Sequence, residues 1–191
     1  GDRAEYFPVY YVEPYKGNEA ALGFDLASNS VRREALERAR DMGKMSTSMR
    51  VRLVPDKAAT ERYGVLTFAP IYSRGALLDS VAERRNSLEG LVFCAVRVGD
   101  IVDKPLDAFH DDGMEAFVSD KTAPEAESIL YAYPPGAGKG TRDFASAADV
   151  GRRGGGLEVE KTLWFANREW DVRMRATPKF IGDQEVMRPW Q

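Results

Sequence analysis

Apolar residues recur along this chain with two different periods, and together the two periods predict a mixed α and β protein. Val31, Ala35, Ala39 and Met42 follow helical spacing within residues 30–42, and Leu36 lies beside them. Serine and asparagine residues before this segment favour a helix start, and the glycine after it favours a helix end. The charged residues of the predicted helix are expected to face water, namely Arg32, Arg33, Glu37, Arg38 and Arg40.

In the remaining apolar segments, apolar residues either alternate with polar residues or follow one another without a break, and both patterns predict β-strands. The predicted strands are 6–12, 49–54, 64–72, 90–98, 116–119, 128–133, 157–166 and 169–176, and the last two form a hairpin around Asn167-Arg168. A second, short helix is predicted from residue 99 to about 109. Residues 73–89 are interpreted as a polar connector that allows one short helix, and residues 134–156 as a long glycine-rich loop. Runs of strands with few helices are typical of antiparallel sheets in an α+β fold.

Alternation also predicts which side chains are buried. In the closing hairpin, Trp170, Val172 and Met174 fall on one face and are expected in the core, whereas Asp171 and Arg173 fall on the other. Cys94 lies in an apolar strand between apolar neighbours, so we expect a buried structural thiol.

Composition narrows the class of protein. The chain has 191 residues, of which 43% are apolar and 30% charged, and its net charge is −3. This balance predicts a globular domain and argues against a nucleic-acid partner, which usually requires a basic surface. One cysteine and one histidine exclude an internal disulfide, a multi-cysteine zinc site and histidine-rich metal sites. We therefore expect no cofactor and no metal, and we interpret His110-Asp111-Asp112 as a solvated helix end. No run of about 18 apolar residues is present to span a membrane.

A glycine-rich stretch, 134–141, resembles the phosphate loop of adenylate kinases and follows a predicted strand. Such a loop aims backbone N–H groups and a lysine, here Lys139, at phosphate oxygens. Tyr133 stands where the pattern needs glycine, and the following residues cannot form a long apolar-faced helix. A hairpin loop is therefore the favoured interpretation, and a small nucleotide-binding enzyme that uses 134–141 is the alternative function.

Asp25 lies in Gly-Phe-Asp-Leu, an apolar setting just before the predicted helix. Two interpretations are equally supported. The carboxylate either forms an Asx turn that prepares the helix start, or it fixes one polar group of a small ligand in an apolar site.

Several stretches together resemble the CHASE domain, the extracytoplasmic sensory module of transmembrane histidine kinases and nucleotide cyclases. The matching residues are Phe7-Pro8-Val9, Tyr11, Glu13-Pro14, Gly17-Asn18-Glu19, Gly23, Asp25, the arginine-rich helix, Leu66–Tyr72 and Gly90-Leu91-Val92-Phe93. The resemblance runs from the start of the chain to about residue 110. The hairpin with Trp170 and the tail ending in Arg188-Pro189-Trp190 resemble the stretch that leads into the family's second membrane helix.

The resemblance implies an α+β fold of tandem PAS-like lobes with antiparallel sheets. The family's long helix and first distal strands precede residue 1, which implies a distal lobe that is incomplete at its N-terminus. The implied domains are a membrane-distal lobe over 1–76, a connector over 77–89, a membrane-proximal lobe over 90–181 and a juxtamembrane tail over 182–191.

Plant members of the family bind cytokinins, and this implies where a ligand site lies here. The aspartate that holds the adenine ring maps onto Asp25, a backbone contact maps near Thr47, and the pocket threonine maps onto Thr67. We add the neighbouring Tyr11, Phe24 and Ala69 to the expected site. Around Thr47 the sequence MSTSMR differs from the plant pattern, so the resemblance does not name the ligand.

The resemblance finally implies a function and its partners. The expected function is the ligand-sensing ectodomain of a transmembrane receptor of the histidine kinase or diguanylate cyclase type, periplasmic and without catalysis of its own. The expected partners are a small-molecule ligand and a second copy of the chain, joined through the helix that precedes residue 1. Beyond residue 191 we expect a run of about 20 apolar residues that enters the membrane.

Overall fold

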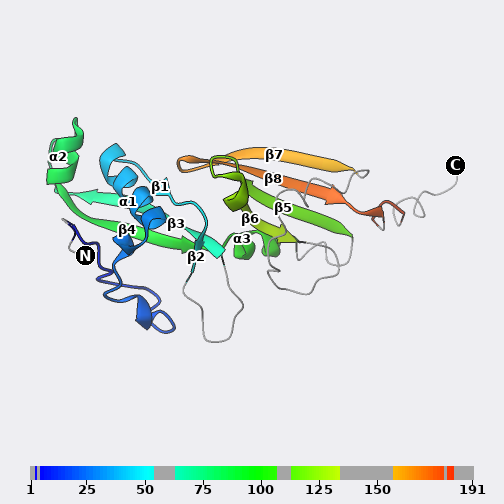
Figure 1. Cartoon of the computed structure of the whole chain (residues 1–191), viewed down its shortest axis with the longest axis horizontal. Coiled ribbons are helices and arrows are strands. Elements are labelled where there is room, and N and C mark those ends of the chain that lie inside the picture. Colours follow the sequence, from blue (N-terminus) through cyan, green and yellow to red (C-terminus); the bar gives the residue numbers. More distant parts are fainter. Residues whose placement is uncertain are drawn as a thin grey trace.

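The computed structural model describes residues 3, 5–53, 63–106, 113–133, 157–178 and 180–182, which form two lobes side by side along the long axis of the molecule (Figure 1). The N-terminal lobe contains the 3-10 helices η1 (Glu19–Ala21) and η2 (Leu26–Ser28), helices α1 (Ser30–Met42) and α2 (Val81–Asn86), and strands β1 (Ser46–Thr47), β2 (Val51–Arg52), β3 (Tyr63–Tyr72) and β4 (Leu88–Val96). The C-terminal lobe contains α3 (Val98–Leu106), η4 (Glu125–Glu127), β5 (Met114–Asp120), β6 (Ile129–Tyr133), β7 (Glu158–Phe165) and β8 (Arg168–Ala176). Both sheets are antiparallel, so the predicted α+β class is confirmed.

Strand β3 is the centre of the N-terminal sheet. One of its edges pairs first with β2 and then with β1, and its other edge pairs with β4 from Val65 to Tyr72. Thr67 therefore lies between Thr47 on β1 and Cys94 on β4. Because side chains alternate along a strand, Leu66 and Phe68 face one side of this sheet and Thr67 the other.

Helix α1 forms where the sequence predicts it. The side chain of Asn29 accepts a hydrogen bond from the N–H of Arg32 at 3.1 Å, and Gly43 ends the helix with a φ of 63°, which favours glycine. Met42 was predicted on the apolar face of the helix but is 59% exposed at its end. Arg40 was predicted to face water, and this is wrong: its side chain is buried and forms ion pairs with Asp41 and Glu5. A buried arginine needs such partners to offset its desolvation.

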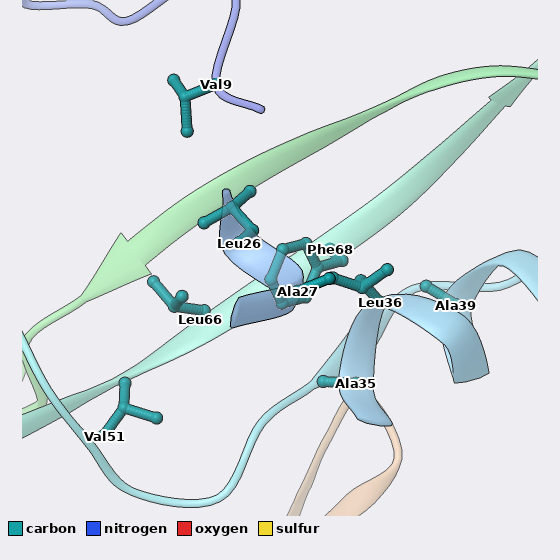
Figure 2. Packing of buried hydrophobic residues seen from close by; sticks show 9 residues of the cluster. All are labelled: Val9, Leu26, Ala27, Ala35, Leu36, Ala39, Val51, Leu66 and Phe68. Atoms are coloured by element: carbon teal, nitrogen blue, oxygen red, sulfur yellow. The ribbon is translucent and has the colours of Figure 1, made fainter. Parts of the chain in front are cut away.

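The core of the N-terminal lobe lies between α1, η2 and one face of β3 (Figure 2). Leu36 and Phe68 are both 0% exposed and lie at its centre. The buried members of this cluster are Val9, Leu26, Ala27, Ala35, Leu36, Ala39, Val51, Leu66 and Phe68. Phe93 of β4 packs against them, with its ring centroid 6.0 Å from that of Phe68. The other face of the sheet has no part in this core.

The C-terminal sheet has the strand order β6-β5-β8-β7. Its core contains Trp170, whose ring stacks on Phe165 with centroids 4.5 Å apart, and Val172 packs against the cluster. Both were predicted in the core and are confirmed, whereas Met174 is only half-buried and lies outside the cluster. Val65 of β3 belongs to this second cluster, so the two lobes share apolar contact.

Three further sequence expectations differ from the structure. Residues 6–12 form no strand but one isolated bridge, Pro8 to Asp25. Phe7 and Val9 do form main-chain hydrogen bonds with residues 23–26, but those residues form a turn and the start of η2 rather than a partner strand. Cys94 is exposed rather than buried, because it lies on the face of the sheet that α1 does not cover. Strand β4 pairs with β3, so the predicted connector 77–89 lies inside the N-terminal lobe and the chain passes between lobes after Val96.

Candidate functional site

Asp25 joins the start of the N-terminal segment to the turn before α1. Its Oδ1 accepts hydrogen bonds from the N–H groups of Phe7 and Ala27, both at 3.0 Å. Its Oδ2 is paired with the guanidinium of Arg3, which also donates to the carbonyl of Ala27. Asp25 is thus the N-cap of η2, and the Asx-turn interpretation of this residue is confirmed as its structural role.

These partners stabilise the charged form of Asp25. The hydrogen bond from the Phe7 N–H is the main cause that lowers the pKa of the carboxyl, and the Ala27 N–H and the Arg3 guanidinium act in the same direction. Desolvation of the carboxyl raises its pKa, but by less than these contacts lower it. The carboxyl therefore remains ionised at neutral pH.

The lowered pKa gives a pH-dependent contribution to stability. Asp25 binds protons more weakly folded than unfolded, so its contribution is fully present above the unfolded pKa of about 4 and is lost as the pH falls through the lower folded value. At pH 7 we expect the wild-type chain to unfold at a higher urea concentration than Asp25→Asn. We expect the difference between the two midpoints to shrink below pH 4. A difference that stays constant from pH 7 to pH 2 would contradict the ionised contact.

Phe24 and Tyr11 lie on the same N-terminal segment as Asp25 but on its surface. The ring of Phe24 is partly exposed, and the guanidinium of Arg32 lies over it, 5.1 Å from the ring centroid. Tyr11 is 73% exposed, and its hydroxyl donates to Glu13 at 3.2 Å. Neither side chain is enclosed by the described residues.

Thr47 and Thr67 are brought together by the register of β1 and β3. Their hydroxyl groups form a hydrogen bond across the two strands, and both residues are buried. The main chain of Thr47 is also engaged: its N–H donates to Oδ1 of Asn167 at 2.6 Å, and its carbonyl accepts from Nε of Arg168 at 3.1 Å. The predicted backbone contact at Thr47 is therefore filled by the β7–β8 hairpin in this structure.

Ala69 follows Thr67 on the same side of β3 and is half-buried. This side of the N-terminal sheet, which we call the open face, is defined by Thr67, Ala69, Ile71, Val92 and Cys94. Ile71 and Val92 are 46% and 59% exposed, and Cys94 is exposed too. The open face therefore combines exposed apolar side chains with a buried pair of hydroxyl groups.

The structure thus divides the six predicted site residues into two groups. Thr47, Thr67 and Ala69 lie on the open-face side of the sheet. Tyr11, Phe24 and Asp25 belong to the N-terminal segment, and the residues that follow Asp25 in η2 pack on the opposite face, beside Leu66 and Phe68. No described contact links the two groups.

Sequence reasoning missed Asn167 and Arg168 as members of this region. It placed them in a hairpin turn, and the structure confirms the hairpin with its turn at Ala166-Asn167. Their contacts with Thr47 join positions 120 residues apart, which no local pattern reveals. The only signal was a polar pair in a turn, a feature shared by most hairpins.

Some predicted features lie outside the described residues: the glycine-rich loop with Lys139, the His110-Asp111-Asp112 run, and the tail beyond residue 182. Within the described part of the chain, no group of three or more histidine, cysteine, aspartate or glutamate side chains is arranged to bind a metal. None of the described helices combines the length and apolar character that a membrane span requires.

Comparisons with known proteins give this fold a family. The CHASE domain family matches residues 1–131, so the chain belongs to the CHASE domains, which are extracytoplasmic sensor domains of signalling proteins. The chain is 24% identical over 198 aligned residues to hybrid signal transduction histidine kinase A of Dictyostelium discoideum. That alignment covers 98% of this chain but only 9% of the relative's length.

A solved structure has a similar fold. The periplasmic sensory domain of the Campylobacter jejuni chemoreceptor Tlp1 superposes with a TM-score of 0.54 at 12% identity, over 97% of this chain and 73% of that one. The match covers both lobes and therefore supports the arrangement of the two sheets along one axis.

Proposed function

We propose that this chain is the ligand-sensing domain of a transmembrane receptor of the histidine kinase or diguanylate cyclase type, and that it binds a small molecule on its N-terminal lobe. Its membership of the CHASE family supports the sensory role. In the complete receptor, ligand binding shifts the packing of the two lobes, and flanking helices carry that change across the membrane. The chain itself performs no catalysis in this proposal.

The observation that carries the ligand site is the open face. It exposes Ile71 and Val92 beside Ala69 and the buried Thr47–Thr67 hydroxyl pair. Small-molecule sites are lined mostly by apolar side chains with a few placed polar groups, and the open face offers both kinds of group. We therefore place the apolar body of the ligand against β3 and β4, and its polar group at Thr67.

Asp25 is a separate proposed ligand contact, because η2 packs on the face of the sheet opposite the open face and one small ligand cannot reach both. Its three protein partners occupy three of the about four acceptor positions of a carboxylate, so one position is left for a donor on a ligand. Asp25→Asn is the suitable variant, because the amide oxygen can still accept from Phe7 and Ala27. Asp25→Ala removes both of these main-chain contacts and tests the fold instead.

Thermal-shift screening of the chain against amino acids, organic acids, nucleobases and sugars is expected to find a stabilising ligand. Thr67→Val is then expected to weaken its binding about tenfold, the effect of one lost hydrogen bond, as measured by calorimetric titration. Thr67→Ser keeps the hydroxyl and is the matched control, with affinity near that of wild type. Equal affinity for wild type, Thr67→Val and an occluding Ala69→Trp variant would remove the open face as the site.

The alternative function, a nucleotide-binding enzyme that uses 134–141, has no described structural feature in its favour. Titration with ATP or ADP in the presence of Mg²⁺ separates the two functions. We expect no thermal shift with either nucleotide and no change on Lys139→Ala.

A further inference from the structure

The segment that carries Thr47 forms an edge of the N-terminal sheet and contacts the β7–β8 hairpin of the other lobe. Ser46, Thr47 and Ser48 are each 2% exposed or less. The N–H of Ser48 donates to the carbonyl of Leu66 on β3 at 2.9 Å, so the main-chain groups of Thr47 point away from β3, as alternation in an antiparallel pair requires. These groups are buried and need partners from elsewhere.

The partners come from the other lobe. Asn167 accepts from the N–H of Thr47 at 2.6 Å and from the hydroxyl of Ser46 at 3.2 Å through one amide oxygen. Arg168 donates through Nε to the carbonyl of Thr47 at 3.1 Å. The hairpin turn thus binds both main-chain groups of the residue whose hydroxyl meets Thr67.

On the other side of this contact, Arg168 is fixed in the C-terminal sheet. Its Nη1 donates to Oδ2 of Asp120 at 2.6 Å and to the hydroxyl of Thr122 at 2.9 Å. Asp120 is 0% exposed and lies at the end of β5. Because a buried carboxylate without its cation is strongly unfavourable, the guanidinium follows β5 and cannot move freely with β1.

The backbone of the turn is strained. Ala166 has a φ of 53°, a backbone conformation that residues other than glycine rarely adopt. Strain of this kind persists only where surrounding contacts fix the chain. Here the contacts of Asn167 and Arg168 with β1 are those nearest to the turn.

We propose that the turn of the β7–β8 hairpin, through Asn167 and Arg168, couples the position of β1 to the C-terminal sheet and so passes the state of the N-terminal lobe to the C-terminal lobe. The inference rests on the proposed function for its role in signalling. A shift of β1 against β3 either carries the hairpin with it or breaks the hydrogen bonds at Thr47. The apolar contact of Val65 and the hydrogen bond from Arg50 to the carbonyl of Ile129, 2.9 Å, align the lobes beside this coupling.

Hydrogen exchange of the ligand-free chain tests the coupling, so its outcome is independent of the ligand screen. Leu36→Val perturbs the N-terminal core, a cluster that contains no residue of the turn, and is expected to raise amide exchange about fivefold in both β3 and β5. In an Asn167→Ala background, the same substitution is expected to raise exchange in β3 only. Asn167→Asp retains an acceptor and is expected to restore the response of β5.

Two controls keep the test specific. Ala166→Gly relaxes the same turn without removing a contact, and Asn86→Ala removes an exposed asparagine at the end of α2. Both are expected to leave the response of β5 unchanged. The proposal is overturned if Leu36→Val affects β5 equally with and without Asn167, or if it never affects β5. A ligand screen that fails while the exchange pattern appears would overturn the proposed function alone.

Discussion

Exchanging Arg168 for methionine is expected to lower the free energy of unfolding by about 3–5 kcal/mol, the cost of leaving one member of a buried ion pair alone. Asp120 would keep its hydrogen bonds from Thr122 but lose its only described cationic partner. The carbonyl of Thr47 would also lose its donor. Urea denaturation at neutral pH measures the difference.

Arg173→Met on the same strand is the matched control. Arg173 is partly exposed and pairs with Glu158 and Glu160, which lie at the surface, so its loss is expected to cost less than about 1 kcal/mol. Combining Arg168→Met with Asp120→Asn should recover part of the lost stability, because no buried charge is then left unpaired. Similar losses for the variants at 168 and 173 would contradict the buried pair.

Replacing Phe68 with alanine is expected to cost about 3–5 kcal/mol, because the ring is fully buried between the sheet and α1 and a cavity would remain. Ile71→Ala on the same strand is the control. Ile71 faces the open side of the sheet and is 46% exposed, so its loss should cost at most about 1 kcal/mol. Chemical denaturation of both variants checks the contrast, and equal costs would mean that the open face is covered in solution.

Helix α1 and the long strands were predictable because local signals and burial agree there, whereas α2 lies within a predicted connector. In α1 the cap at Asn29, the glycine at position 43 and the buried Ala35, Leu36 and Ala39 point to one helix. In the closing hairpin, alternation correctly separated Trp170 from its polar neighbours. Such short-range patterns predict elements well because each element buries its own apolar side.

Tertiary contacts determine the burial and the site contacts that the sequence did not predict. Cys94 and Arg40 carry ordinary strand and helix patterns, yet one is exposed and the other buried, since the covering of a sheet face and the pairing of charges are long-range features. The family resemblance grouped Asp25 with Thr67 in one expected site, and the fold in addition gives Asp25 a capping role of its own. The junction at Asn167 joins distant segments and was invisible to local reasoning.

Amide NMR of the chain, titrated with a ligand from the thermal-shift screen, tests the central claim most directly. The account predicts that the largest shift changes fall on Thr67, Ala69 and their neighbours in β1 and β4, with smaller changes reaching Asn167 and β5. Largest changes within β7 or η4, or a ligand set that produces no saturable shifts at all, would contradict a sensor site on the N-terminal lobe.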